Sequence, residues 1–218
     1  MADQKKYTGL LAPIENWLSA VTEKDLIKGA GIVVVTGLFA AGAAYSSAAR
    51  IQIPSTASAV VSTGMISGIA AIGAFVVTLL GWVFSTVIYH VGAYALGGKG
   101  ALNRMFALAG YASIPAMAQE LLRLINYSIL GQATTPTIGG VIDTILNYFN
   151  VFSIIGLVLV GVAVMINYGI SWKRAAIVAL LPTIIGIAFA LATRQILGGR
   201  MAANATSGGL SFNMRRSG

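Results

Sequence analysis

The feature that most constrains this chain is a set of long apolar windows without any charged residue. The first lies between Lys28 and Arg50 and holds 21 residues, which at ~1.5 Å per residue cross a hydrocarbon core of ~30 Å. A soluble domain carries about 25% charged residues, whereas this chain carries 9%. The sequence therefore predicts an all-α membrane protein with several spans.

Charges and turn residues divide the apolar region, residues 29–196, into five expected transmembrane helices. Pro54 and neighbouring hydroxyl residues mark a turn after the first span. The next uncharged window is too long for one ordinary span but contains no turn signal, so we expect one long protruding helix. The predicted spans are about 29–49, 59–94, 102–125, 142–168 and 175–193.

The two ends of the chain are expected to lie outside this bundle. Within residues 1–28, apolar positions recur at helical spacing, which predicts a short amphipathic helix over 12–25 lying in the membrane interface with Trp17 among the headgroups. A solvated linker remains the alternative for this segment. The Gly-, Ser- and Asn-rich residues 197–218 predict a flexible C-terminal tail.

The distribution of basic residues predicts a multi-pass protein with a cytoplasmic N-terminus and an external C-terminus. With five spans, the basic residues that fall inside are Lys5, Lys6, Lys24, Lys28, Lys99, Arg104, Lys173 and Arg174. Those that fall outside are Arg50, Arg123, Arg194, Arg200 and the distant Arg215 and Arg216.

The stretch from residue 97 to 115, GGKGALNRMFALAGYASIP, is the most distinctive in the chain. Its glycines allow a tight inner turn, and its two basic residues predict contacts to acidic lipid headgroups or to a partner on the inner face. The candidate contact residues are Gly97, Gly98, Lys99, Gly100 and Arg104.

Pro115 predicts a bend in the third span, because proline removes a backbone donor inside an apolar helix. The carbonyl near Tyr111 then needs another donor, and the Ser113 hydroxyl or that of Tyr111 is nearest by sequence. We expect this helix to pack against a small-residue face formed by Gly64 and Gly68.

Three ionisable residues form a candidate polar cluster near the outer ends of the third and fourth spans: Glu120, Arg123 and Asp143. Glu120 and Arg123 are three residues apart on one helix and can pair, and Asp143 could reach Arg123 across the outer loop. Two interpretations remain open. The cluster is either an ion pair that joins two helix ends or part of a polar pocket that opens outward beside Pro115.

Other classes of chemistry find little support in the residues. Zero cysteines exclude disulfides and thiol catalysis, and the single histidine, His90, cannot build a histidine-based metal site. No nucleophile–base pair, facing carboxylates or cofactor motif is recognisable, so we expect no enzymatic activity and no cofactor. The basic residues lie in short clusters at the ends of the apolar segments and leave no basic face, which argues against nucleic-acid binding.

Two motifs carry a resemblance to a known family. GGKG at 97–100, followed by Arg104 and ALAGYASIP at 107–115, resembles the Yip family, as does LLAPIENW at 10–17. The resemblance implies a non-enzymatic membrane component linked to vesicle transport that binds Rab-type GTPases and other family members. The N-terminal segment of 28 residues is short for a eukaryotic member and suggests a prokaryotic, archaeal one, located in the plasma membrane.

Two functional hypotheses follow. The first is a structural or adaptor role in membrane organisation or trafficking, through the inner basic turns and the surface helix. The alternative is a small transporter or lipid-handling protein that uses the polar outer pocket. Membrane lipids are expected partners, with a cytoplasmic protein, a small GTPase by resemblance, and a homo-oligomer left open. A water-filled cavity or a bound lipid at the cluster of Glu120, Arg123 and Asp143 would favour the alternative, and a closed dry bundle the first hypothesis.

Overall fold

The computed structural model describes residues 11–50, 62–130 and 150–209, with side chains described up to residue 193 apart from that of residue 130. All regular elements in these ranges are helical. In chain order they are α1 (Ala12–Ser19), a 3-10 turn η1 (Glu23–Asp25), α2 (Leu26–Ala48), α3 (Thr63–Ala95), α4 (Leu102–Ala112), α5 (Ile114–Ile125), a π turn η2 (Asn126–Leu130), α7 (Val151–Tyr168) and α8 (Trp172–Gly209).

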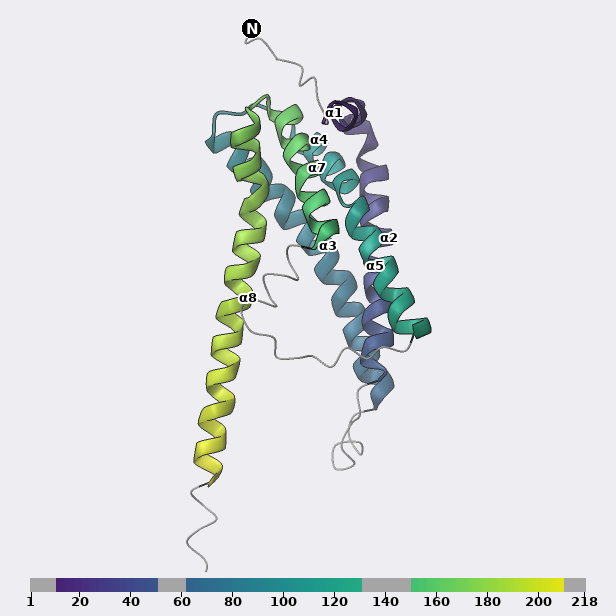
Figure 1. Ribbon diagram of the computed structural model, residues 1–218, viewed down its shortest axis with the longest axis vertical. Helices are drawn as coiled ribbons and strands as arrows, with labels where there is room; N and C mark the ends of the chain where they lie inside the picture. Colours follow the sequence, from purple (N-terminus) through teal and green to yellow (C-terminus); the bar gives the residue numbers. More distant parts are fainter. Residues whose placement is uncertain (1–10, 51–61, 131–149, 210–218) are drawn as a thin grey trace, which may run out of the picture.

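The helices cross the bundle in alternating directions (Figure 1). α1 lies at one end, and α2 runs away from it, α3 returns, α4 and α5 together run away again, α7 returns and α8 leaves. Within the described ranges, four segments are long and apolar enough to span a membrane: Glu23–Ala48, Thr63–Ala95, Val151–Tyr168 and Trp172–Thr193. The predicted all-α membrane class is therefore confirmed, with the third expected span divided into two shorter helices.

Several boundaries differ from the expected ones. α1 ends at Ser19 and does not continue to residue 25, because Thr22 is extended and begins a new turn. The Asp25 carboxylate accepts hydrogen bonds from the Thr22 backbone N–H at 3.0 Å and from its hydroxyl at 2.9 Å. At the other end of the chain, α8 continues as helix to Gly209, past the start of the expected tail at 197. Residues 210–218 lie outside the described ranges.

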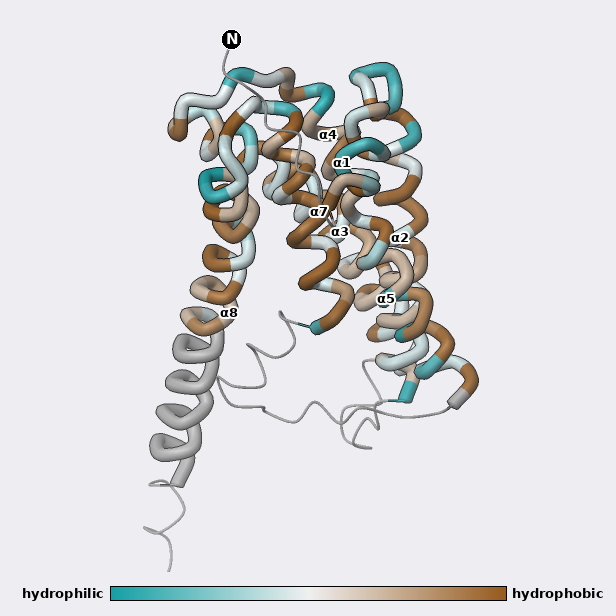
Figure 2. The backbone as a smooth tube through the Cα atoms, turned by 45° about the horizontal axis from the view of Figure 1, so that its top comes forward, coloured by the Kyte–Doolittle hydropathy of each residue, from teal (hydrophilic) through white to brown (hydrophobic). Residues whose placement is uncertain are grey.

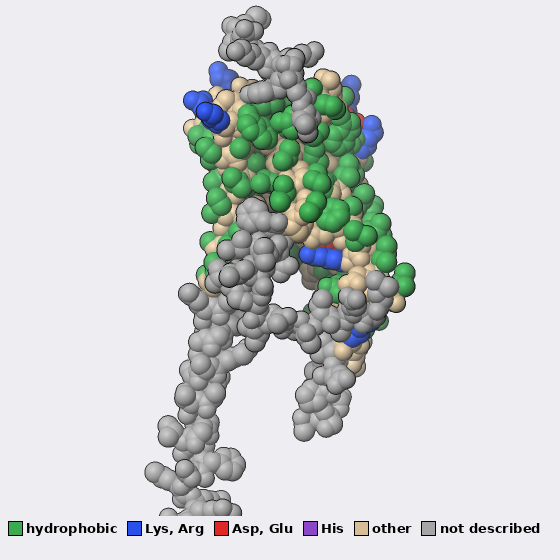
Figure 3. Space-filling model, viewed as in Figure 1, with side chains coloured by type: hydrophobic (Ala, Val, Ile, Leu, Met, Phe, Trp, Pro, Cys, Tyr) green, Lys and Arg blue, Asp and Glu red, His purple; other side chains and the backbone are tan. Residues whose placement is uncertain are grey.

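The surface of the bundle is that of a membrane-embedded body. Large apolar side chains on α3 are exposed, among them Ile72, Val77 and Phe84. Figure 3 shows apolar side chains over much of the face of the molecule in view. The buried core lies where α1, α4, α7 and α8 meet, around Met105 and Leu108. Figure 2 shows hydrophilic residues gathered at the end that carries α1 and the interhelical turns.

The backbones of α2 and α4 approach closely at two glycines. A Cβ atom on Gly110 would lie 2.4 Å from the Gly29 carbonyl oxygen, and one on Gly29 would lie 2.7 Å from the oxygen of Ala107. By contrast, a Cβ on Gly64 or Gly68 would have no neighbour within 4 Å. The expectation that the third span packs on Gly64 and Gly68 is therefore wrong, because these residues lie at the end of α3 that is remote from the turn into α4.

Candidate functional site: a basic end and an interior cavity

The turn between α3 and α4 is held against the end of α7 by its backbone. Gly97 has a φ of 85°, a left-handed conformation that favours glycine. The Lys99 N–H donates to the Tyr168 carbonyl at 3.0 Å, and a Cβ on Gly100 would lie 2.4 Å from the carbonyl oxygen of Asn167. The turn can therefore sit directly on α7 only because glycine occupies this contact.

Side chains from both neighbouring turns reinforce this contact. The Asn167 amide donates to the Ala101 carbonyl at 3.0 Å, and the Arg174 guanidinium donates to the Leu96 carbonyl at 3.1 Å. Together they join the α3–α4 turn to the α7–α8 turn. The two turns thus form one fixed surface at this end of the bundle.

Arg104 fastens the N-terminal helix to the same end. Its guanidinium donates to the Val21 carbonyl at 3.0 Å and to the Ser19 carbonyl at 3.3 Å, so it supplies donors to carbonyls that the end of α1 leaves without helical partners. Leu18 is fully buried, and the Trp17 and Tyr111 rings meet edge to face with centroids 5.9 Å apart. Arg104 is thus engaged within the protein.

Exposed cations surround this surface, and we call the whole region the basic end. Figure 3 shows Lys and Arg side chains at the corresponding end of the molecule. Lys28 pairs with Asp25 at 2.8 Å, whereas the Lys99 side chain projects from the turn without a partner in the described ranges. The exposed members are Lys24, Lys28, Lys99, Lys173 and Arg174.

The break in the third pass lies at Ser113, two residues before the proline. α4 ends at Ala112 and α5 begins at Ile114, with the buried Pro115 in its first turn, where the missing N–H needs no partner. The Ser113 hydroxyl donates to the Gly110 carbonyl at 2.6 Å. The expected interruption near the proline is present, and the Ser113 hydroxyl satisfies a carbonyl one residue earlier than the expected Tyr111.

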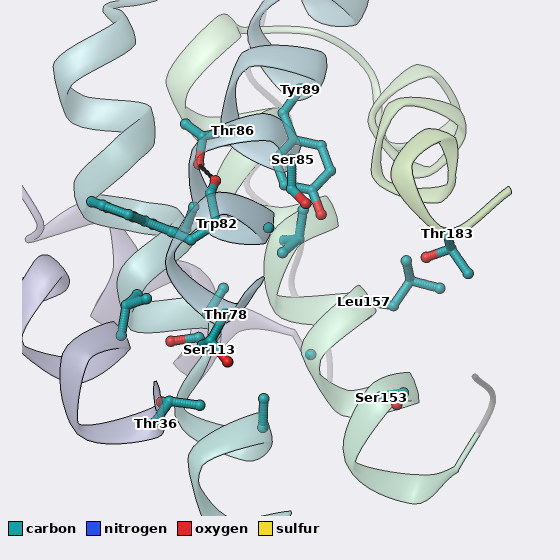
Figure 4. Close-up of a pocket in the computed structure, with 17 residues that line it drawn as sticks. Thr36, Thr78, Trp82, Ser85, Thr86, Tyr89, Ser113, Ser153, Leu157 and Thr183 are labelled. Carbon is teal, nitrogen blue, oxygen red and sulfur yellow. Dashed lines mark hydrogen bonds between the residues drawn. The ribbon is translucent and has the colours of Figure 1, made fainter. Parts of the chain in front are cut away.

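A cavity of about 280 Å³ lies between the helices beside this break (Figure 4). Its wall is built by α2, α3, α4, α5, α7 and α8, with small residues such as Gly81, Ala112 and Gly156 leaving the space open. No lining residue in the part of the chain that the structure describes carries a formal charge. Its polar lining residues are Thr36, Thr78, Trp82, Ser85, Thr86, Tyr89, Ser113, Ser153 and Thr183.

The hydroxyls of the wall fall into two groups. Four of them donate to a carbonyl of their own or the preceding turn, at 2.6 to 2.9 Å, and these are Thr36, Thr78, Thr86 and Ser113. The side chains of the other four make no hydrogen bond within the described part of the chain, and these are Ser85, Tyr89, Ser153 and Thr183. The cavity therefore offers free hydroxyl groups from α3, α7 and α8.

The comparison with family models decides what kind of protein this is. The model of the Yip1 domain matches residues 8–193, which is most of the chain. The chain belongs to the Yip1 domain family. No curated protein and no solved structure matches it. The resemblance in the two sequence motifs is thereby confirmed, and the protein is a Yip-type multi-pass membrane protein.

The predicted polar cluster of this Yip1 domain lies apart from the cavity wall. Arg123 and Glu120 form an ion pair at 2.7 Å, in which the Arg123 side chain is 43% exposed and that of Glu120 19% exposed. Neither residue lines the cavity. Asp143 lies outside the described residues. The described pair lies within α5 and does not by itself join two helix ends.

The sequence left open a pocket beside Pro115 at the charged cluster, whereas the uncharged wall of the cavity of the Yip1 domain was not predicted, although a signal was present. Thr78, Trp82, Ser85 and Tyr89 follow one another at spacings of three and four residues, which places them on one face of a helix. A polar stripe of this kind within an otherwise apolar span could have indicated an interior wall.

Proposed function

We propose that this Yip1-domain protein is a non-enzymatic structural or adaptor component of its membrane, and that its basic end is the working surface. The observation that supports this best is the way that end is fixed. Arg104, Arg174 and the Lys99 N–H all bond to backbone carbonyls of other segments, and these bonds join α1 and the two interhelical turns. A preorganised surface loses little conformational freedom when a partner docks.

The orientation we propose is that the basic end faces the cytoplasm. The described basic residues divide unequally between the two ends of the bundle, and the excess of Lys and Arg marks the cytoplasmic side of a multi-pass protein. At the basic end lie Lys24, Lys28, Lys99, Arg104, Lys173 and Arg174. At the opposite end lie Arg50 and Arg123, with Arg194 and Arg200 further along α8.

The partner we propose is a cytoplasmic protein with an acidic surface. Lys99 and Lys173 project from the two fixed turns, so their charges are held close to a rigid backbone surface. Exposed charges of this kind chiefly steer association and set its dependence on salt. A small GTPase is the partner that family membership suggests, and trafficking or membrane organisation is the matching role.

Orientation can be tested first, because the chain has no cysteine of its own. Single cysteines replacing Lys99 and Thr135 are treated in intact cells with an impermeant thiol reagent. Protection of Lys99→Cys and labelling of Thr135→Cys are expected. Labelling of Lys99→Cys from outside contradicts the proposed orientation.

The adaptor role is tested by a photocrosslinking amino acid at Lys173, with the same group at Phe84 on the exposed flank as a matched control. A protein crosslink at Lys173 that disappears in the Lys24→Glu and Lys99→Glu double variant, and is absent at Phe84, supports the proposal. Identical products at both positions, or crosslinks at Lys173 to lipid alone, argue against an adaptor.

A further inference from the structure

The interior cavity holds polar groups that a membrane bundle would not be expected to leave without partners. Buried donors and acceptors are satisfied in the great majority of native structures. Here the Trp82 indole nitrogen is fully buried and has no hydrogen-bond partner among the described residues. Ser85 and Tyr89 point towards the same part of the cavity in Figure 4, and Thr183 approaches it from α8. The Trp82 nitrogen is closed off from the cavity as well, so the groups able to hold a polar occupant are the hydroxyls of Ser85, Tyr89 and Thr183.

The occupant has to be uncharged. Among the described residues none that lines the cavity is acidic or basic, and an ionised group without a counter-charge is costly inside a membrane protein. The four hydroxyls without side-chain partners can each donate and accept, which suits esters, ethers and alcohols. A phosphate or an ammonium group would find no ion partner in this wall.

The position and size of the cavity indicate that the occupant comes from the bilayer. Thr78 and Ser85 lie well inside the 33-residue α3, and Ala116 of the wall is exposed, so the space reaches the surface of the apolar bundle. About 280 Å³ is just below the range of ligand sites, ~300–1,000 Å³. It accommodates the polar centre of a lipid, while the hydrocarbon chains remain in the membrane.

We propose that the cavity is a binding site for a neutral glycerolipid, with the glycerol hydroxyl and ester or ether oxygens of a diacylglycerol-type molecule bonded to the hydroxyls of α3, α7 and α8. Thr86 and Thr36 donate their protons to carbonyls of their own helices, so their oxygens serve as acceptors. Ser85, Tyr89 and Thr183 serve as donors. The proposal goes beyond the adaptor role and does not depend on it.

Trp82 makes a direct test available. The chain has three tryptophans, so Trp17→Phe combined with Trp172→Phe leaves Trp82, which lines the cavity, as the only indole. This protein is reconstituted in phosphatidylcholine nanodiscs that contain diacylglycerol brominated in one acyl chain. Matched discs carry the same mole fraction of brominated phosphatidylcholine. Stronger quenching of Trp82 by the brominated diacylglycerol, reversed by unlabelled diacylglycerol, is expected.

Two variants decide whether the signal comes from the cavity. Gly156→Leu fills it, since a Cβ there has only the Ala112 oxygen as a neighbour, at 3.7 Å, and should abolish the selective quenching. Gly68→Leu lies outside the wall and should not. Ser85→Ala with Thr183→Ala should weaken diacylglycerol binding about tenfold, since two uncharged hydrogen bonds are lost.

Three results overturn the proposal. They are equal quenching by the two brominated lipids, no quenching by either, and selective quenching that survives in Gly156→Leu. Size-exclusion profiles and melting temperatures of all variants establish that they are folded. If Gly156→Leu does not fold, the double hydroxyl variant decides, and unchanged diacylglycerol binding in that variant refutes the site.

Discussion

The crossing of α2 and α4 leaves no room for a methyl group at Gly110, and this can be tested by replacing it with alanine. The added Cβ would lie 2.4 Å from the Gly29 carbonyl oxygen, 2.5 Å from its carbonyl carbon and 2.6 Å from its Cα. All three atoms belong to backbone inside a helix, so no side-chain rotation relieves the overlap. The two helices have to move apart.

The size of the effect follows from two opposing terms. Restoring ordinary van der Waals contact of ~3.5 Å requires the helices to separate by about 1 Å, and overpacking of this kind costs about 1–3 kcal/mol. Because the obstacle is backbone, the upper part of that range applies. The higher helix propensity of alanine returns about 1 kcal/mol. We therefore expect Gly110→Ala to reduce the free energy of unfolding by about 2 kcal/mol, which lowers the melting temperature by about 4–8 °C for a chain of this size.

The measurement is thermal unfolding of detergent-solubilised protein, followed by the loss of the monodisperse size-exclusion peak after heating. Gly68→Ala on α3 is the matched control, since a Cβ there meets nothing within 4 Å and the substitution should leave the melting temperature unchanged or raise it. Gly110→Ala melting at or above the wild-type temperature would refute the reasoning, as would equal losses in the two variants.

Three further substitutions probe the contacts of the basic end and the outer ion pair. Arg104→Met should release α1 and speed tryptic cleavage of the segment after it. Lys99→Met removes an exposed side chain and should not speed this cleavage. Equal cleavage rates in the two variants would contradict the contact between Arg104 and the end of α1. Gly100→Ala should reduce the free energy of unfolding by about 1–3 kcal/mol and so lower the melting temperature, because its Cβ would lie 2.4 Å from a backbone oxygen of α7. An unchanged melting curve would show that the turn is not held there. Arg123→Ala should cost at most about 1 kcal/mol, since that side chain is 43% exposed, and adding Glu120→Ala should cost no more; a larger loss in the single variant would mean that the pair is buried.

The course of the chain through the membrane could be predicted because the bilayer imposes it. Uncharged windows of sufficient length have to become helices where no water is available to the backbone, and helices joined by short turns then run in alternating directions. The break of the third pass near Pro115 could be predicted from the missing N–H. The break lies at Ser113 because Pro115 occupies the first turn of α5. The length of the span does not determine this position.

Partners between helices could not be predicted in the same way. Gly64 and Gly68 have the spacing of a small-residue face, but spacing describes one helix and says nothing of what lies opposite. The pair that meets is Gly29 with Gly110, which lie in different helices and share no motif. The same limit hid the role of Arg104, because its charge is visible in the sequence while the carbonyls that it reaches belong to a turn more than eighty residues earlier.

The basic end and the cavity are connected through α4, and this gives a final prediction. Arg104, in the first turn of α4, holds α1, and the other end of the same 11-residue helix contributes Ala109 and Ala112 to the cavity wall. Between them, Phe106 packs edge to face on Trp82 with centroids 5.1 Å apart. A short buried helix moves as one body, so a change at Arg104 should be felt at Trp82.

In the protein whose only tryptophan is Trp82, Arg104→Met should therefore shift the emission maximum and raise the accessibility of the indole to acrylamide, because the Phe106 ring no longer holds its position. Lys99→Met is the control, since that side chain lies outside α4 and is exposed. Trp82 emission is also measured in the same variants after trypsin has cleaved α1 off. This comparison distinguishes an effect of losing α1 from an effect of losing the Arg104 side chain. If Trp82 emission is the same in Arg104→Met and Lys99→Met, α4 does not transmit the state of α1, and the basic end and the cavity function as separate parts of the molecule.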